Sequence, residues 1–114
     1  MNMRERVPEV DAKTTYEQFQ KGEVQLLDVR EASEWALGHI EGASFIPMSE
    51  LGQRWRELDA SAKWVCVCRS GNRSEYVTAL LRQAGLDVAN LAGGMLDWKA
   101  NKLPITPPGI VESH

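Results

Sequence analysis

Short apolar segments alternate with amphipathic ones along this chain. The apolar segments predict strands at residues 7–10, 24–29, 43–46, 64–67 and 88–91. The amphipathic segments predict helices at about residues 14–21, 33–37, 49–58, 72–84 and 96–101. Strands that alternate with helices are typical of a parallel sheet, so the pattern predicts an α/β fold.

Two helix starts carry recognisable capping residues. Thr14 with Glu17 three residues later forms a capping-box pattern, and Gly22 closes that helix. Asn72 with Glu75 predicts the cap of a second helix, which Gly85 ends. The predicted buried stripe of this second helix consists of Tyr76, Val77, Leu80, Leu81 and Ala84.

Size and composition indicate one soluble globular domain. The chain has 114 residues, of which 43 % are hydrophobic and 25 % charged. We expect a domain over residues 1–103 and an extended, proline-rich tail over residues 104–114. The net charge of −3 disfavours a general nucleic-acid role. No secretory signal and no apolar stretch of about 20 residues is visible, so we expect a cytoplasmic protein without membrane contact.

The cysteines, Cys66 and Cys68, occur as Cys-Val-Cys. A disulfide between residues two apart in an extended segment would be strained, so we expect none. A zinc site needs about four ligands, and His39 and His114 are the remaining strong candidates. The sequence therefore predicts no metal. Cys66, inside an apolar strand, is interpreted as a core residue.

Cys68 stands where a buried strand ends and a polar loop leads into a helix. This cysteine loop, residues 68–73, reads Cys-Arg-Ser-Gly-Asn-Arg. Gly71 lets successive backbone N–H groups turn inward, and the following helix contributes the positive end of its dipole. The dipole is worth up to about 2 kcal/mol, and each N–H bond to a charged sulfur about 1.5–3 kcal/mol. We therefore predict a Cys68 pKa below that of a free thiol and a nucleophilic role.

Four motifs in order resemble the rhodanese family. They span most of the chain, from about residue 7 to residue 103. The motifs are Leu27-Asp-Val-Arg30 with Glu34-Trp35, Gly38-His-Ile-Glu-Gly-Ala43 with Ile46-Pro47, the cysteine loop, and Leu91-Ala-Gly-Gly94 with Trp98.

The resemblance implies a rhodanese-like three-layer sandwich, in which a five-stranded, mainly parallel sheet has helices on both faces. It implies a sulfurtransferase in which Cys68 takes sulfane sulfur from a donor such as thiosulfate and carries it as a persulfide. The acceptor would be cyanide in vitro and a thiol or a protein in the cell. No cofactor is implied. The expected substrate-binding residues are Arg69, Ser70, Gly71, Asn72 and Arg73.

The family topology places the second and fourth strands side by side. Asp28 and Arg30 would then support the cysteine loop through hydrogen bonds, and Ser74 would support it from the helix. Two alternatives stay open: Asp28 as a strand-end turn residue, and Arg30 as a surface partner of Glu34. Two-domain relatives carry basic residues at the positions of Glu34 and Ser70, so we expect modest thiosulfate affinity.

Two other functions are alternatives to catalytic sulfur transfer. Phosphatases related to this fold use Cys-x5-Arg, whereas Arg73 follows Cys68 after four residues and Ser74 holds the phosphatase position. The shorter loop predicts a ring better matched to one sulfur atom than to a phosphate. The other alternative is a sulfur-carrier or protein-interaction module with little small-molecule turnover.

Overall fold

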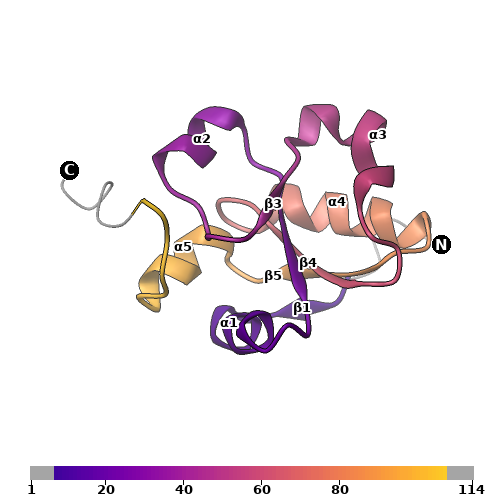
Figure 1. Cartoon of the computed structure of the whole chain (residues 1–114). Helices are drawn as coiled ribbons and strands as arrows, with labels where there is room; N and C mark the ends of the chain where they lie inside the picture. The colour runs from indigo at the N-terminus through magenta and orange to yellow at the C-terminus, as the bar shows by residue number, and fades with distance from the viewer. Residues whose placement is uncertain (1–6, 108–114) are drawn as a thin grey trace.

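The computed structural model describes residues 7–107 and contains a five-stranded parallel sheet (Figure 1). The strand order across the sheet is β1-β5-β4-β2-β3, and every pair of neighbours is parallel. The strands are β1 (Glu9–Val10), β2 (Gln25–Asp28), β3 (Ser44–Phe45), β4 (Lys63–Val67) and β5 (Asp87–Leu91). The predicted parallel α/β sheet is confirmed, with short strands at both edges.

Helices cover both faces of this sheet. The α-helices are α1 (Ala12–Gln20), α2 (Ala32–Leu37), α3 (Leu51–Arg54), α4 (Asn72–Gln83) and α5 (Gly94–Ala100). Two 3-10 helices, η1 (Met48–Glu50) and η2 (Trp55–Glu57), flank α3. Figure 1 shows α3 and α4 on one side of the sheet and α1 on the other. The arrangement is the predicted three-layer sandwich.

The central strand β4 divides the core into two. Trp64 and Cys66 point to the face covered by α3 and α4, where they pack with residues such as Leu81. Val65 and Val67 point to the opposite face, where they join Trp98 of α5. A central parallel strand is buried on both faces, which explains the continuous apolar run in the sequence. Because all strands run in one direction, the segments after β2 and β4 emerge at the same edge of the sheet.

Three local predictions need correction. Helix α1 begins two residues before Thr14, since Asp11 caps it by accepting a hydrogen bond from the Thr14 N–H at 2.7 Å. The single helix expected over 49–58 is broken into η1, α3 and η2. In α4, Val77 and Leu81 are buried as expected, but Tyr76 and Leu80 are 51 % and 38 % exposed, and Ala84, just after the helix, is exposed too. The buried face of α4 instead includes Ser74, Thr78 and Ala79.

Part of the predicted tail packs against the domain. The Trp98 indole donates a hydrogen bond to the Pro104 carbonyl at 2.9 Å, and Ile105 packs against the core. His39 and Thr106 form an antiparallel bridge. Residues 108–114 of that tail lie outside the described residues. Within residues 7–107, no helix has the length and apolar character to cross a membrane.

Candidate active site

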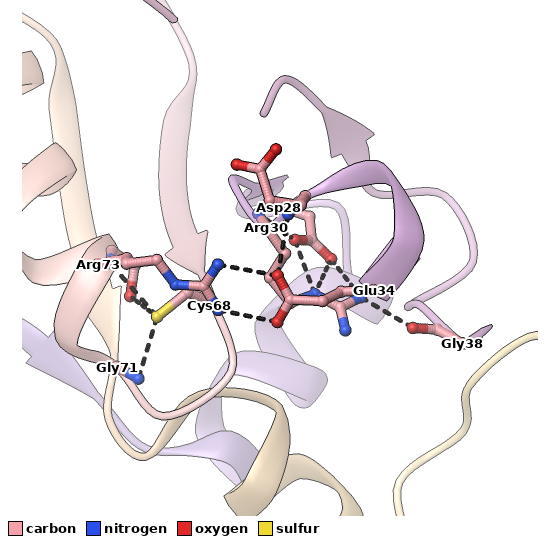
Figure 2. Close-up of polar contacts among 9 residues, drawn as sticks. Asp28, Arg30, Glu34, Gly38, Cys68, Gly71 and Arg73 are labelled. Carbon is pink, nitrogen blue, oxygen red and sulfur yellow. Dashed lines mark hydrogen bonds and ion pairs between the residues drawn. The ribbon is translucent and has the colours of Figure 1, made fainter. Parts of the chain in front are cut away.

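The Cys68 sulfur lies inside a turn of hydrogen-bond donors at the end of β4 (Figure 2). The Gly71 backbone N–H points at Sγ with an N···S distance of 3.1 Å. The Ser74 backbone N–H and the Ser74 hydroxyl both lie 3.3 Å from Sγ. Gly71 has φ +101°, a left-handed conformation that glycine adopts without strain and that turns the cysteine loop back over the sulfur.

This geometry corrects the predicted cap of α4. Asn72 is the first residue of the helix, and Gly71, which has no side chain, occupies the capping position. The N–H of Ser74, in the first turn, would normally be satisfied by the side chain of the capping residue. Here it points at the Cys68 sulfur instead. The sulfur therefore acts as the cap of α4, and the helix dipole favours a negative charge on it.

The two cysteines differ in acidity. Burial raises the pKa of the Cys68 thiol, but hydrogen bonds from the Ser74 hydroxyl and from the N–H groups of Ser74, Gly71 and Ser70 outweigh it and leave the pKa below its ordinary value. Burial, followed by the nearby charge of Cys68, raises the pKa of the Cys66 thiol far above its ordinary value. Cys68 is therefore the more acidic thiol of the pair, whereas Cys66 is a core residue.

Cys68 itself has no solvent-exposed surface. The predicted site would fail if the side chain were buried and the neighbouring N–H groups pointed outward. In the structure the Cys68 side chain is buried, but the Gly71 and Ser74 N–H groups point inward at the sulfur. The residues beside it, Arg69 and Ser70, are exposed. The sulfur is therefore covered by the protein, beside an exposed part of the cysteine loop.

A buried asparagine that the sequence analysis did not select holds the cysteine loop in place. Asn90 of β5 is 1 % exposed, and its amide nitrogen donates a hydrogen bond to the Gly71 carbonyl at 3.1 Å. Its amide oxygen accepts a short hydrogen bond from the Ser74 hydroxyl. That hydroxyl has one proton and two acceptors, Asn90 Oδ1 and Cys68 Sγ. A polar residue inside an otherwise apolar strand is the sequence signal that could have identified Asn90.

The first turn of α5 fixes the carbonyl side of the cysteine loop. The Met95 N–H donates to the Cys68 carbonyl at 2.8 Å, and the Leu96 N–H donates to the Arg69 carbonyl at 3.0 Å. A side chain on Gly94 would place its Cβ 2.4 Å from the Cys68 carbonyl oxygen. The Gly-Gly turn of the fourth motif therefore permits the close approach that orients the loop.

The Asp28–Arg30 pair lies at the same edge of the sheet as the cysteine loop, but its hydrogen bonds are made within the pair and to Gly38. β2 and β4 are neighbours, as expected, with Asp28 beside Val67. The Arg30 guanidinium donates to both carboxylate oxygens of Asp28 at 2.8–3.0 Å and to the Gly38 carbonyl at 2.8 Å. Neither side chain has a hydrogen bond to the cysteine loop among the described residues, which corrects that part of the prediction. Arg30 is 4 % exposed, so it is not a surface partner of Glu34.

The two arginines of the cysteine loop have different surroundings. Arg73 forms a two-point ion pair with Glu34 of α2, with N···O distances of 2.8 and 2.9 Å (Figure 2). Arg69 is exposed and has no ion pair within the part of the chain that the structure describes. The exposed side chains of Ser70 and Asn72 flank the loop. Among residues 7–107, no three His, Cys, Asp or Glu side chains are grouped to hold a metal ion.

Comparison with known proteins places these features in a family. Residues 11–101 match the Rhodanese-like domain, and the chain belongs to this family. It is 36 % identical over 104 residues to a protein named Sulfurtransferase from Allochromatium vinosum, covering 90 % of this chain and 97 % of that protein. A rhodanese-related protein from Thermoplasma volcanium superposes with a TM-score of 0.83 at 32 % identity, covering 87 % of this chain and 97 % of that one.

The same domain also occurs within longer proteins. The chain is 40 % identical over 86 residues to the HTH-type transcriptional regulator Rv0324 of Mycobacterium tuberculosis. The match covers 74 % of this chain and 38 % of that protein. Together, the family and the relatives named for it support sulfur transfer in general for this chain.

Proposed function

We propose that this chain takes sulfane sulfur from a donor such as thiosulfate, holds it as a persulfide on Cys68, and passes it to a nucleophilic acceptor. The observation that carries the proposal is the set of donors around Sγ, which is two backbone N–H groups and one hydroxyl within 3.3 Å. These donors lower the Cys68 pKa despite burial. A thiolate is the nucleophile that sulfur transfer requires.

The cycle has two displacements. The Cys68 thiolate attacks the outer sulfur of thiosulfate, the sulfur–sulfur bond breaks, and sulfite leaves with the bonding electron pair. An acceptor such as cyanide then attacks the outer sulfur of the Cys68 persulfide, which yields thiocyanate and returns the thiolate. The N–H groups that point at Sγ stabilise the negative charge of the thiolate before the first displacement and after the second. In the cell, a thiol or a protein would replace cyanide.

The proposal gives the other residues of the cysteine loop distinct roles. Gly71 and Ser70 supply backbone N–H groups, and Ser74 supplies an N–H and a hydroxyl. Arg69 and Asn72 would meet the part of the donor that faces solvent, whereas the Arg73 guanidinium is paired with Glu34. Asn90 keeps the Gly71 carbonyl turned away from the sulfur, so the Gly71 N–H stays available.

The test is a thiosulfate-to-cyanide assay combined with intact-mass measurement. Wild type should gain the mass of one sulfur atom on thiosulfate treatment, lose it on addition of cyanide, and release thiocyanate. Cys68→Ser should do neither. Cys66→Ala is the matched control, because Cys66 is buried and neutral, and it should retain both reactions. Sulfur loading that persists in Cys68→Ser, or that is lost only in Cys66→Ala, would contradict the assignment.

A sulfur-carrier or interaction module with little turnover is the second candidate. The absence of exposed surface on Cys68 favours it, because burial limits the access of small donors and acceptors to the sulfur. The same experiment separates the two functions. A carrier would load sulfur from a donor yet turn over slowly with free cyanide. An interaction module would show no added sulfur with any donor.

A further inference from the structure

The ion pair between Arg73 and Glu34 places a negative charge beside one of the two arginines of the cysteine loop. Arg73 reaches from the first turn of α4 to Glu34 of α2, which lies 39 residues earlier in the chain. The negative charge of Cys68 also acts on Arg73. The pKa of the Arg73 guanidinium is raised mainly by Glu34 and to a lesser degree by Cys68. An arginine that would otherwise attract an anion to Cys68 is thus already paired.

Glu34 is held in place independently of Arg73. Its carboxylate accepts a hydrogen bond from the Glu31 N–H at 3.0 Å, and this contact forms part of the capping box of α2. The hydrogen bonds from Arg73 lower its pKa to about 2, against the opposing effect of burial. Glu34 is therefore ionised at neutral pH, and its side chain is fixed before a substrate arrives.

The remaining positive charges near Cys68 are few. Arg30 is buried and is committed to Asp28 and the Gly38 carbonyl. Arg69 is the cation of the cysteine loop without an ion pair among the described residues. The other groups that contact Sγ are neutral. Arg69 thus supplies one full positive charge to a bound donor. The site can therefore compensate about one negative charge in addition to that of the thiolate.

Donors differ in the negative charge they bring. When the thiolate attacks thiosulfate, three negative charges come together at the site, and sulfite leaves carrying two of them. Attack on the protonated outer sulfur of an organic hydropersulfide, R–S–SH, gathers one. In that step the sulfur–sulfur bond of the hydropersulfide breaks, R–S⁻ leaves with the bonding electron pair, and Cys68 retains the outer sulfur and its proton as Cys–S–SH. The second reaction needs less compensating charge from the protein.

We propose that Glu34, by neutralising Arg73, makes the site selective for low-charge sulfane donors of the hydropersulfide class over dianionic ones. This inference rests on the proposed sulfur transfer through Cys68. It makes Glu34 a specificity-determining residue that acts through Arg73. Removing its charge while keeping its shape should free Arg73 to meet a sulfonate group.

The test compares two donors on wild type and Glu34→Gln. The donors are thiosulfate and the hydropersulfide of 2-mercaptoethanol, and the readout is the ratio of their kcat/KM values for sulfur loading of Cys68. Glu34→Gln should raise the thiosulfate-to-hydropersulfide ratio about tenfold, the effect of one unit charge in a partly screened site. High ionic strength should shrink this change. Glu23→Gln is the matched control, because it makes the same change in net charge at an exposed glutamate between α1 and β2, and its ratio should equal that of wild type.

The outcomes separate this inference from the proposed function. If neither donor adds sulfur to wild-type Cys68, the proposed function fails. If both donors load Cys68 and the ratio is the same in wild type and Glu34→Gln, or falls, the inference about Glu34 is wrong while sulfur transfer stands. A melting temperature for each variant shows that the compared proteins are folded. Arg73→Gln gives a second check, since Glu34→Gln should change the ratio more in wild type than in the Arg73→Gln background, because only in wild type does it free a guanidinium to donate hydrogen bonds to the sulfonate group. An equal change in both backgrounds would show that Glu34 does not act through Arg73.

Discussion

Replacing Ser74 by alanine removes one of the hydrogen bonds that hold charge on the Cys68 sulfur. The Ser74 hydroxyl lies 3.3 Å from Sγ, and among the stabilising contacts it lowers the Cys68 pKa most. The Ser74 backbone N–H, which also points at Sγ, stays in place in the variant. Ser74→Ala therefore tests the hydroxyl alone.

The size of the effect follows from the value of a hydrogen bond to a charged group. Such a bond contributes about 1.5–3 kcal/mol, which corresponds to about 1–2 pKa units. The Ser74 proton is shared with Asn90 Oδ1, so part of its contribution to the sulfur is already lost. We therefore expect the Cys68 pKa to rise by about one unit in Ser74→Ala, the low end of that range.

The assay is the pH dependence of alkylation by iodoacetamide, followed by intact mass. Only the thiolate reacts, so the rate rises with pH through the Cys68 pKa and then levels off. In Ser74→Ala the midpoint should move to higher pH by about one unit, and the rate at neutral pH should fall up to about tenfold. The plateau rate at high pH should change far less, because the variant alters the fraction of thiolate rather than its access.

Ser70→Ala is the control within the same loop. Ser70 acts on the sulfur through its backbone N–H, which alanine retains, so its midpoint should match that of wild type. Loss of the hydroxyl leaves Asn90 Oδ1 buried without its donor, so Ser74→Ala should also be less stable by about 1–3 kcal/mol. A Ser74→Ala midpoint equal to that of wild type in a folded protein would refute the role given to the hydroxyl.

Three further predictions test the surroundings of the cysteine loop. Gly94→Ala should lower the free energy of unfolding in urea by about 2 kcal/mol or more, because the new Cβ would lie 2.4 Å from the Cys68 carbonyl oxygen at a φ of +57°. Iodoacetamide should leave Cys66 unlabelled in the native protein and label it after unfolding, as peptide mapping would show, since burial raises its pKa. Asp28→Asn should cost about 3 kcal/mol of stability in urea, because it leaves the Arg30 guanidinium buried without a counter-charge.

Strand positions could be predicted from the sequence because each depends on a short apolar segment. The central strand is the clearest case, since the run from Trp64 to Val67 is apolar without interruption and lies buried on both faces of the sheet. Helix boundaries were less secure, because neighbouring polar residues compete for one capping position. Asp11 and Thr14 both suit a helix start, and the backbone geometry that favours Asp11 is not visible in composition.

The site could be located from the sequence, but its connections could not. The strand, the glycine and the following helix are contiguous, so local patterns sufficed to place Cys68 at a turn of backbone donors. The pairing of Arg73 with Glu34 joins residues 39 positions apart, and that of Ser74 with Asn90 joins residues 16 apart. Each depends on how elements pack in space. Arg30 illustrates the same limit. It was expected either to support the cysteine loop or to pair with Glu34 at the surface, and packing buries it against Asp28 instead.

The failed prediction for Asn72 shows how the site is coupled to the fold. A side-chain cap from this residue would have satisfied the first-turn N–H groups of α4 within the helix itself. With glycine at the capping position, the Ser74 N–H is left for the sulfur, and the helix depends on Cys68 for that contact. A thiolate accepts hydrogen bonds more strongly than a thiol, so the negative charge that the proposed function requires on Cys68 would also stabilise the end of α4. The Cys68 pKa is lower in the folded chain than in the unfolded one, so this stabilisation is complete above the pKa of the unfolded thiol and is lost as the pH falls through the folded pKa.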